Sequence, residues 1–295
     1  MGWGWYLMFV GFPCGMVGQR RFVGTSGLLN LSTPQFSGDG SLPGAFASFG
    51  RLWTAAFHTL LWPAAAAVSL SVALAGHEAT GSGLLLVALG TMAAYGLDRW
   101  LDRREIDPQD VRRFLALAVG LASVGMAVLA CTSGWRFRMC AVLAVIAGAY
   151  VPLKRVVPKN LLTTVAWTSA TATLPFAATP ELDGTFAASV AAVAFIMGAN
   201  TVLCDVPDVA ADRAAGVKGI TPRFGARAGR WAAAVCGASG ALVAASVGRW
   251  GLAATAAALV GLAWLMARRP DHRGYRLWVD AVVTLIPGPM AWLFR

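Results

Sequence analysis

The chain has 295 residues, of which 57% are hydrophobic and only 13% charged, and its formal net charge is +10. Soluble domains carry about 25% charged residues, so this composition and a mean hydropathy of +0.63 exclude an ordinary soluble domain. They indicate an integral membrane protein with several spans. The positive charge is not interleaved with aromatic residues in a polar context, so we expect no nucleic-acid binding.

Residues 1–50 differ from the rest of the chain. Their apolar stretch precedes Arg20 and Arg21, whereas the positive charges of a secretory signal peptide come before its apolar segment. Residues 22–50 are rich in glycine, serine and proline, which is typical of a loop. We therefore expect a poorly specified extension over 1–50 and a membrane domain over 51–295.

From residue 51 onward the apolar runs predict an all-α, polytopic membrane bundle of about nine transmembrane helices. The expected spans are 53–75, 82–97, 114–131, 137–153, 161–179, 185–204, 231–248, 251–267 and 277–294. Two prolines, Pro287 and Pro289, lie inside the last run, so we expect a kink there.

The distribution of positive charge predicts how the spans are oriented. From Arg51 onward there are 22 lysine and arginine residues, and 18 of them lie before the first run or after the second, fourth, sixth and eighth runs. Cytoplasmic loops carry such an excess. We therefore expect a bacterial plasma-membrane protein whose N-terminus and candidate active site face the cytoplasm.

Two groups of aspartates lie on this same side. Asp98 and Asp102 follow the second apolar run, and Asp205, Asp208 and Asp212 follow the sixth. On a continuous helix the first pair lies about 40° apart and the second group within about 60°, so each would form one acidic stripe. Carboxylates near a membrane core are costly and usually functional or paired. Carboxylate oxygens select hard cations, and Mg²⁺ is typically held by one or two carboxylates together with substrate phosphates.

Basic residues in the same loops could bind the remaining phosphate oxygens. The candidates for diphosphate binding are Arg99, Arg103, Lys154, Arg155, Arg213 and Lys218. The competing interpretation is that the aspartates and these basic residues form ordinary salt bridges between cytoplasmic loops. Two spaced acidic motifs on one side favour the binding site.

Three stretches resemble the UbiA-type intramembrane prenyltransferases. "DVPDVAADRAAGVKGITPRFG" looks like the family's second aspartate motif, "DRWLDRREID" looks like its first, and "AYVPLKRVVPKNLLTTVAW" resembles its Tyr-to-Lys loop. The resemblance covers about residues 51–295. It implies a helical bundle around a central cavity, with an allylic prenyl diphosphate bound through Mg²⁺ to both motifs and its tail toward lipid. One departure is Ala94, which replaces the usual asparagine, beside Tyr95. Some bacterial members share this Y-x-x-D-R form.

The resemblance predicts transfer of the prenyl group to an aromatic or other lipophilic acceptor. Tyr150 is the candidate for stabilising the allylic carbocation through its ring face. Asp280, early in the last span, could orient or deprotonate the acceptor, or form a salt bridge with Arg276. Trp167 and Phe176 are expected to face lipid or core.

Two other functions remain open at this stage. A membrane terpene cyclase would use the same ionisation step without a second substrate. A transporter or lipid-binding protein is the alternative that is not an enzyme, although the polar groups gather at one membrane face rather than near the midplane.

Overall fold

The computed structural model describes residues 49–294, except 51, 54–55, 104–106, 154–155, 215 and 269–274. The side chains of residues 58, 102, 103, 150–152, 211 and 276 also fall outside the description. The expected extension over 1–50 lies almost entirely outside it. All described residues belong to one compact unit, and none of them forms a strand.

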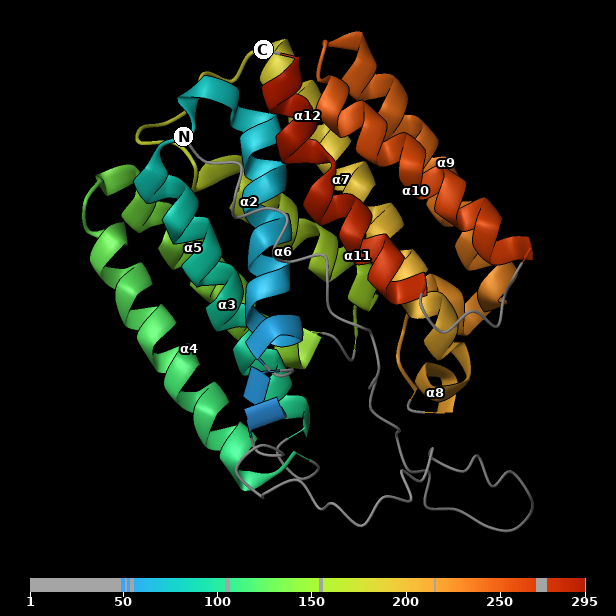
Figure 1. Ribbon diagram of the computed structural model, residues 1–295, viewed down its shortest axis with the longest axis horizontal. Coiled ribbons are helices and arrows are strands. Elements are labelled where there is room, and N and C mark those ends of the chain that lie inside the picture. The colour runs from blue at the N-terminus through green and yellow to red at the C-terminus, as the bar shows by residue number, and fades with distance from the viewer. Residues whose placement is uncertain are drawn as a thin grey trace. The chain divides into compact units, whose positions relative to one another are not determined.

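The described chain is a succession of helices (Figure 1). A π-helix, Phe57–Leu61, leads into α2, and single 3₁₀ turns follow α2 and α7. The helices are α2 Trp62–Ala75, α3 Gly81–Arg103, α4 Gln109–Ala130, α5 Gly134–Leu153, α6 Lys159–Thr173, α7 Gly184–Asp205, α8 Val209–Ala214, α9 Ile220–Ser246, α10 Trp250–Arg268, α11 Tyr275–Leu285 and α12 Pro287–Leu293.

Each of the first eight expected spans overlaps one of these helices, the ninth overlaps α11 and α12, and the all-α prediction is confirmed. Six described segments are long and apolar enough to cross a membrane, from Thr59–Glu78 to Trp250–Arg268. The exact number of nine spans stays a prediction. The last span is divided, because α11 ends at Leu285 and α12 begins at Pro287, which has no N–H to donate. The Ser69 hydroxyl of α2 accepts a hydrogen bond from Gly288 N at 2.9 Å beside this break.

The seventh span begins earlier than the apolar pattern predicts. Helix α9 starts at Ile220, whereas the expected span starts at 231. Arginines at 223, 227 and 230 make this segment look like a loop. The helix is interrupted at Gly225, whose φ of 88° lies in the region that glycine adopts without strain. The segment before Gly225 is therefore a separate helical turn.

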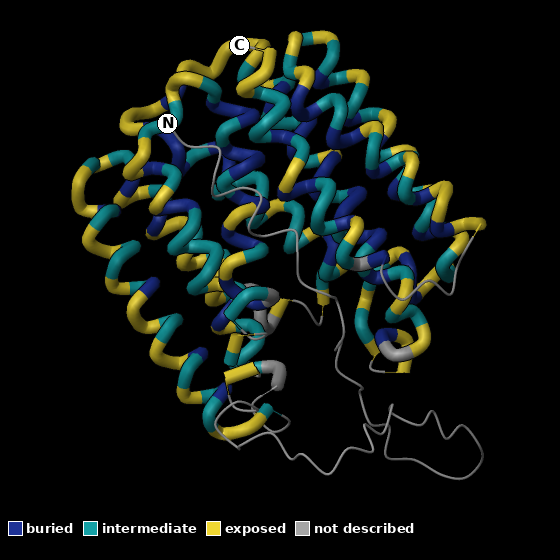
Figure 2. The backbone as a smooth tube through the Cα atoms, viewed as in Figure 1, coloured by how far each residue is buried: buried dark blue, intermediate teal, exposed yellow. Residues whose placement is uncertain are grey.

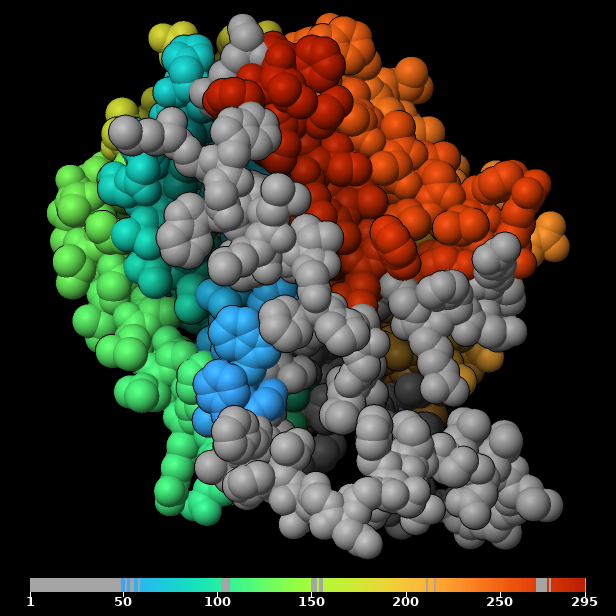
Figure 3. Space-filling view, in the orientation of Figure 1, coloured from blue at the N-terminus to red at the C-terminus, as the bar shows by residue number. Residues whose placement is uncertain are grey.

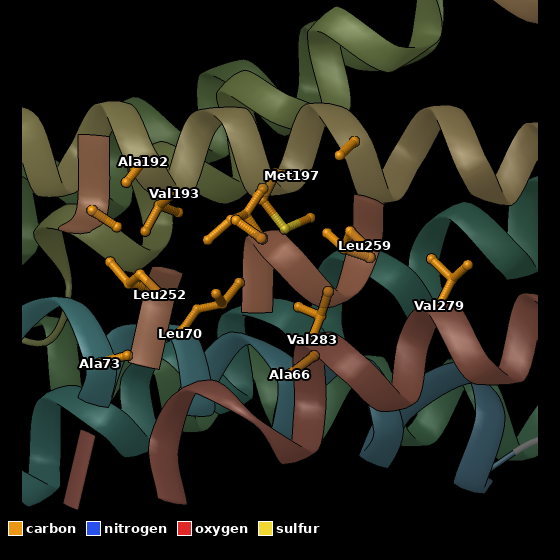
Figure 4. Packing of buried hydrophobic residues seen from close by; sticks show 14 of the residues in the cluster. Ala66, Leu70, Ala73, Ala192, Val193, Met197, Leu252, Leu259, Val279 and Val283 are labelled. Carbon is orange, nitrogen blue, oxygen red and sulfur yellow. The ribbon is translucent and has the colours of Figure 1, made fainter. Parts of the chain in front are cut away.

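The main core lies between α2, α7, α9, α10 and α11 (Figure 4). Small residues let α9 and α10 approach closely, since a Cβ on Gly237 would lie 2.8 Å from Val260 Cγ2 and 3.0 Å from Ala256 O. In the space-filling view, the side chains of α10 and of α11–α12 form adjoining surfaces (Figure 3).

Helix α4 shows which surface faces away from the core. It is mostly exposed or half-buried (Figure 2). Its exposed side chains include Leu117, Leu121, Val124 and Val128. They recur every three or four residues and therefore form one apolar stripe along the helix. An apolar stripe of this length on the outside of the bundle is the surface that a lipid bilayer covers.

Helices that alternate in direction place several chain segments at one end of the bundle. We call this the motif end: α3 ends there at Arg103, α7 ends there at Asp205, and α6 begins there at Lys159 (Figure 1). Pro108 and Pro158 stand immediately before α4 and α6. At a helix start the missing proline N–H interrupts no helical hydrogen bond.

Candidate active site

The first acidic segment lies on an unbroken helix. Helix α3 continues to Arg103, so the backbones of Asp98 and Asp102 stand one turn apart on one face, as predicted. The Asp98 side chain is half-buried. The side chains of Asp102 and Arg103 lie outside the described part of the chain.

Arg99 contacts a carboxylate of the same end of the bundle. Its Nε donates to Asp107 Oδ2 at 2.9 Å and its Nη2 to Asp107 Oδ1 at 3.2 Å. The Asp107 side chain is 7% exposed and that of Arg99 is 30% exposed. This bidentate salt bridge holds the segment before α4 against the end of α3. The diphosphate-binding role expected for Arg99 stays a prediction.

The second acidic segment is not one continuous helix, so the condition for a single stripe of its aspartates is not met. Helix α7 ends at Asp205, residues Val206–Asp208 form a 3₁₀ turn, and α8 begins at Val209. Pro207 explains the break, because its ring and missing N–H are incompatible with a helix interior. Asp205 is 4% exposed and Asp212 is 7% exposed, whereas Asp208 is half-buried.

Asp205 makes two contacts with the start of α6. Asn160 Nδ2 donates to its Oδ2 at 2.9 Å, and Lys159 Nζ lies 3.5 Å from its Oδ1. The backbone N–H of Lys159 also donates to Lys218 O at 3.1 Å. The first turn of α6 therefore contacts the second acidic segment and the loop that follows it.

Of the other four expected diphosphate-binding residues, the structure describes Arg213 and Lys218. Arg213 is exposed and donates from Nε to Pro222 O at 3.0 Å. Lys218 is exposed in the loop before α9. Lys154, Arg155 and the Tyr150 side chain lie outside the described residues, so their roles stay predictions.

Two further contacts join side chains inside the bundle, one between α3 and α6 and one between α7 and α11. Trp167 Nε1 donates to the Tyr95 hydroxyl at 3.0 Å, and the two rings meet edge to face with centroids 5.7 Å apart. Cys204 Sγ lies 3.7 Å from Asp280 Oδ1. Asp280, which is expected to orient or deprotonate the acceptor, belongs to the second of these contacts.

The sequence signals these interior residues only weakly. Trp167, expected in lipid or core, packs inside the bundle. Phe176, expected likewise, is buried in the main core. Asn160 stands just outside the expected fifth span, so the apolar pattern does not single it out. Nothing in a single sequence shows that Tyr95 and Trp167, 72 positions apart, share a hydrogen bond.

The donor set at the motif end fits a hard cation, because its metal-ligating candidates are carboxylate oxygens rather than thiolates or imidazoles. Among the described residues, no three histidine, cysteine, aspartate or glutamate side chains are close enough together to hold a metal. The Asp102 side chain lies outside these residues. The type of these ligand atoms, rather than a cluster already formed by them, supports metal binding at this site.

The helices and the acidic segments define a class: an integral membrane protein with a polar reaction site at one end of a helical bundle. A family model described as the UbiA prenyltransferase family matches residues 60–282. The chain belongs to this family and is a membrane prenyltransferase. Members of the family are in general metal-dependent.

Two solved structures have the same fold. One is the apo structure of a UbiA homolog from Aeropyrum pernix K1, with 18% identity and a TM-score of 0.61, covering 80% of this chain and 97% of that one. The other concerns digeranylgeranylglyceryl phosphate synthase in membranes, with 10% identity and a TM-score of 0.53, covering 85% of this chain and 98% of that one. No curated protein matches the chain significantly.

Proposed function

We propose that this protein transfers a prenyl group from an allylic prenyl diphosphate to an aromatic or other lipophilic acceptor within the membrane, with Mg²⁺, and releases diphosphate. The observation that supports this most is the meeting of both acidic segments at one end of an apolar bundle. Family membership supports the prenyl donor. We also propose, from the charge distribution, that the motif end faces the cytoplasm of a bacterial plasma membrane.

The carboxylates of the two acidic segments would hold the metal, namely Asp98, Asp102, Asp205, Asp208 and Asp212. Bound Mg²⁺ would neutralise charge on the diphosphate as it departs. The basic residues proposed to bind the diphosphate oxygens are Arg99, Arg103, Lys154, Arg155, Arg213 and Lys218. They would stabilise the same developing charge by hydrogen bonds that strengthen in a dry site.

In the reaction the bond between the allylic carbon and the diphosphate oxygen breaks, and the diphosphate leaves with the electron pair. The acceptor then forms a bond to that carbon and loses a proton. The Tyr95–Trp167 pair, with Tyr150, offers ring faces to the allylic cation. Asp280 is the group proposed to orient or deprotonate the acceptor, and Cys204 Sγ lies 3.7 Å from its Oδ1.

The test measures pyrophosphate release by the purified protein in detergent. Geranylgeranyl diphosphate and a shorter allylic donor are supplied with or without Mg²⁺ and with or without phenolic acceptors. We expect release to require Mg²⁺ and an acceptor, and Asp208→Ala to abolish it. The control is Glu181→Ala, because Glu181 is exposed between α6 and α7. Release without any acceptor would identify a cyclase instead. No release from folded protein with any donor would refute the proposal.

A further inference from the structure

The two oxygens of the Asp205 carboxylate face different kinds of partner. Oδ2 accepts a hydrogen bond at 2.9 Å from Asn160 Nδ2, which belongs to a neutral amide. Oδ1 lies 3.5 Å from Lys159 Nζ, which is a cation. Rotating the Asn160 amide by half a turn would set its oxygen against a carboxylate oxygen with no proton between them. The amide nitrogen therefore stays with Oδ2, and Oδ1 is the oxygen that faces a positive charge.

The Asp205 carboxylate needs a cation beside it. Its side chain is only 6% exposed, and a buried carboxylate is costly unless a positive charge compensates it. Lys159 supplies that charge in this structure. Asp205 is also one of the carboxylates proposed to hold Mg²⁺, and a bound Mg²⁺ would supply the same compensation. Lys159 and the metal are therefore alternative counter-ions for one carboxylate oxygen.

The Lys159 ammonium can move away from Asp205 while the backbone stays in place. Its distance of 3.5 Å from Oδ1 exceeds the roughly 2.7–2.9 Å of a charge-assisted hydrogen bond. The Lys159 side chain is 40% exposed, and its four-carbon stem is flexible. The backbone is held, because Lys159 begins α6 directly after Pro158 and its N–H donates to Lys218 O at 3.1 Å.

The displaced ammonium would meet the diphosphate. Mg²⁺ is typically held by carboxylates together with substrate phosphates, so a diphosphate bound with the metal lies beside the carboxylates that hold it. Lys159 stands next to one of these carboxylates, that of Asp205. A lysine ammonium has three donors and no acceptor, and it commonly binds phosphate as a point charge. Lys159 is not among the basic residues that the sequence predicts for this role.

We propose that Lys159 pairs with Asp205 Oδ1 until Mg²⁺ takes that place, and that its ammonium then binds the diphosphate. The exchange keeps a positive charge beside the buried carboxylate throughout. It also adds a positive charge at the diphosphate, where negative charge develops as the bond to the allylic carbon breaks. This inference rests on the proposed function, because it adds Lys159 to the residues that bind the diphosphate in that same site.

The test is Lys159→Met, which keeps the length of the side chain and removes its charge. Two midpoints are measured by thermal unfolding of the full chain in detergent. The first is the Mg²⁺ concentration that raises the melting temperature without any added anion, and the second is the concentration of inorganic pyrophosphate that raises it further at saturating Mg²⁺. Lys159→Arg restores the positive charge. The matched control is Arg138→Met, which removes an exposed positive charge near the start of α5.

We expect the two midpoints of Lys159→Met to move in opposite directions. Without the competing ammonium, Mg²⁺ alone should act at a concentration about two- to fivefold lower, as expected for the loss of a partly exposed ion pair. Pyrophosphate should need a concentration at least about tenfold higher, because a hydrogen bond between charged groups is lost. Lys159→Arg should return the pyrophosphate midpoint towards the wild-type value, and Arg138→Met should change neither midpoint.

Three results would overturn the inference. A higher pyrophosphate midpoint without a lower Mg²⁺ midpoint would show that the metal does not displace the ammonium. A lower Mg²⁺ midpoint with an unchanged pyrophosphate midpoint would show that Lys159 is only a counter-ion of Asp205. The third result is no change in either midpoint. A wild-type protein without any response to Mg²⁺ and pyrophosphate would instead refute the proposed function, which is a separable outcome.

A measurement on the wild type covers the case in which Lys159→Met does not fold. The chain has three lysines, Lys154, Lys159 and Lys218, and their labelling by acetic anhydride is read residue by residue by mass spectrometry. Mg²⁺ alone should increase the labelling of Lys159, and pyrophosphate added with Mg²⁺ should then decrease it. The labelling of Lys218, which is exposed, should not rise with Mg²⁺ alone. Labelling of Lys159 that Mg²⁺ leaves unchanged or lowers would contradict the proposed exchange.

Discussion

The hydrogen bond between Trp167 and Tyr95 allows the hydroxyl and the ring of Tyr95 to be tested separately. Tyr95→Phe keeps the ring and removes the oxygen that accepts from Trp167 Nε1 at 3.0 Å. Tyr95→Leu removes the ring as well, and with it the edge-to-face contact at 5.7 Å. Trp167→Phe removes the donor and leaves an aromatic ring in place.

The expected loss of stability follows from these contacts. A buried donor left without its acceptor costs about 1–3 kcal/mol. Hydrogen bonds between helices in a membrane average about 0.6 kcal/mol, so we expect about 1 kcal/mol for Tyr95→Phe. An edge-to-face aromatic pair adds about 0.5–1.5 kcal/mol. Tyr95→Leu should therefore lower the free energy of unfolding by about 2 kcal/mol or more.

The effect on turnover should separate the two variants further. If the Tyr95 ring faces the allylic cation, its cation–π attraction in a dry site is worth about 2 kcal/mol, which corresponds to more than tenfold in rate. We expect Tyr95→Leu to lower kcat by that factor and Tyr95→Phe to change it much less. The measurements are thermal unfolding in detergent and single-turnover prenyl transfer.

Two results would refute this reasoning. Equal kcat values for Tyr95→Phe and Tyr95→Leu would show that the ring face does not meet the cation. Additive stability losses in the double variant Tyr95→Phe/Trp167→Phe would show that the hydrogen bond contributes nothing, because two residues that share an interaction should not lose it twice.

Two further predictions concern the opposite end of the bundle. Gly83→Ala should lower the free energy of unfolding by about 1–3 kcal/mol, because the added Cβ would lie 2.2 Å from Pro175 O. The control Gly81→Ala, with nothing within 4 Å, should be neutral or stabilising in thermal unfolding, and equal melting temperatures would contradict the prediction. Arg136→Lys should cost about 2 kcal/mol, since Arg136 is 4% exposed and donates to three hydroxyls and a carbonyl that one ammonium cannot reach together. Arg138→Lys is the exposed control, and a loss as large as that of Arg136→Lys would count against this geometry.

The sequence predicts the positions of the helices well because an apolar run of membrane length rarely forms anything but a spanning helix. It also predicts the helix that bears Asp98 and Asp102, since no breaker interrupts α3 near them. The start of α9 is missed because arginines at the membrane surface look like a loop. The break at Pro207 is visible in the sequence, but a proline does not reveal whether a helix kinks or ends.

The contacts of the site could not be predicted in the same way. Asn160 meets Asp205 across 45 positions, and periodicity says which face of a helix is apolar but not which helix lies opposite. Arg99 illustrates the same limit. Its charge suggested a phosphate ligand, yet the position of Asp107 after the end of α3 gives it a carboxylate partner.

The two acidic segments are built differently, and this difference gives α6 a role in the proposed reaction. Asp98 and Asp102 are spaced by an unbroken helix, whereas the second segment is broken after Asp205, which contacts Asn160 of α6. Asn160 and Trp167 are seven residues apart on α6, so they lie on the same face, about 10 Å apart along the axis. One helix therefore holds the acidic segment through one residue and the Tyr95 ring through the other. A shift of α6 would therefore move its contacts with Asp205 and with Tyr95 together.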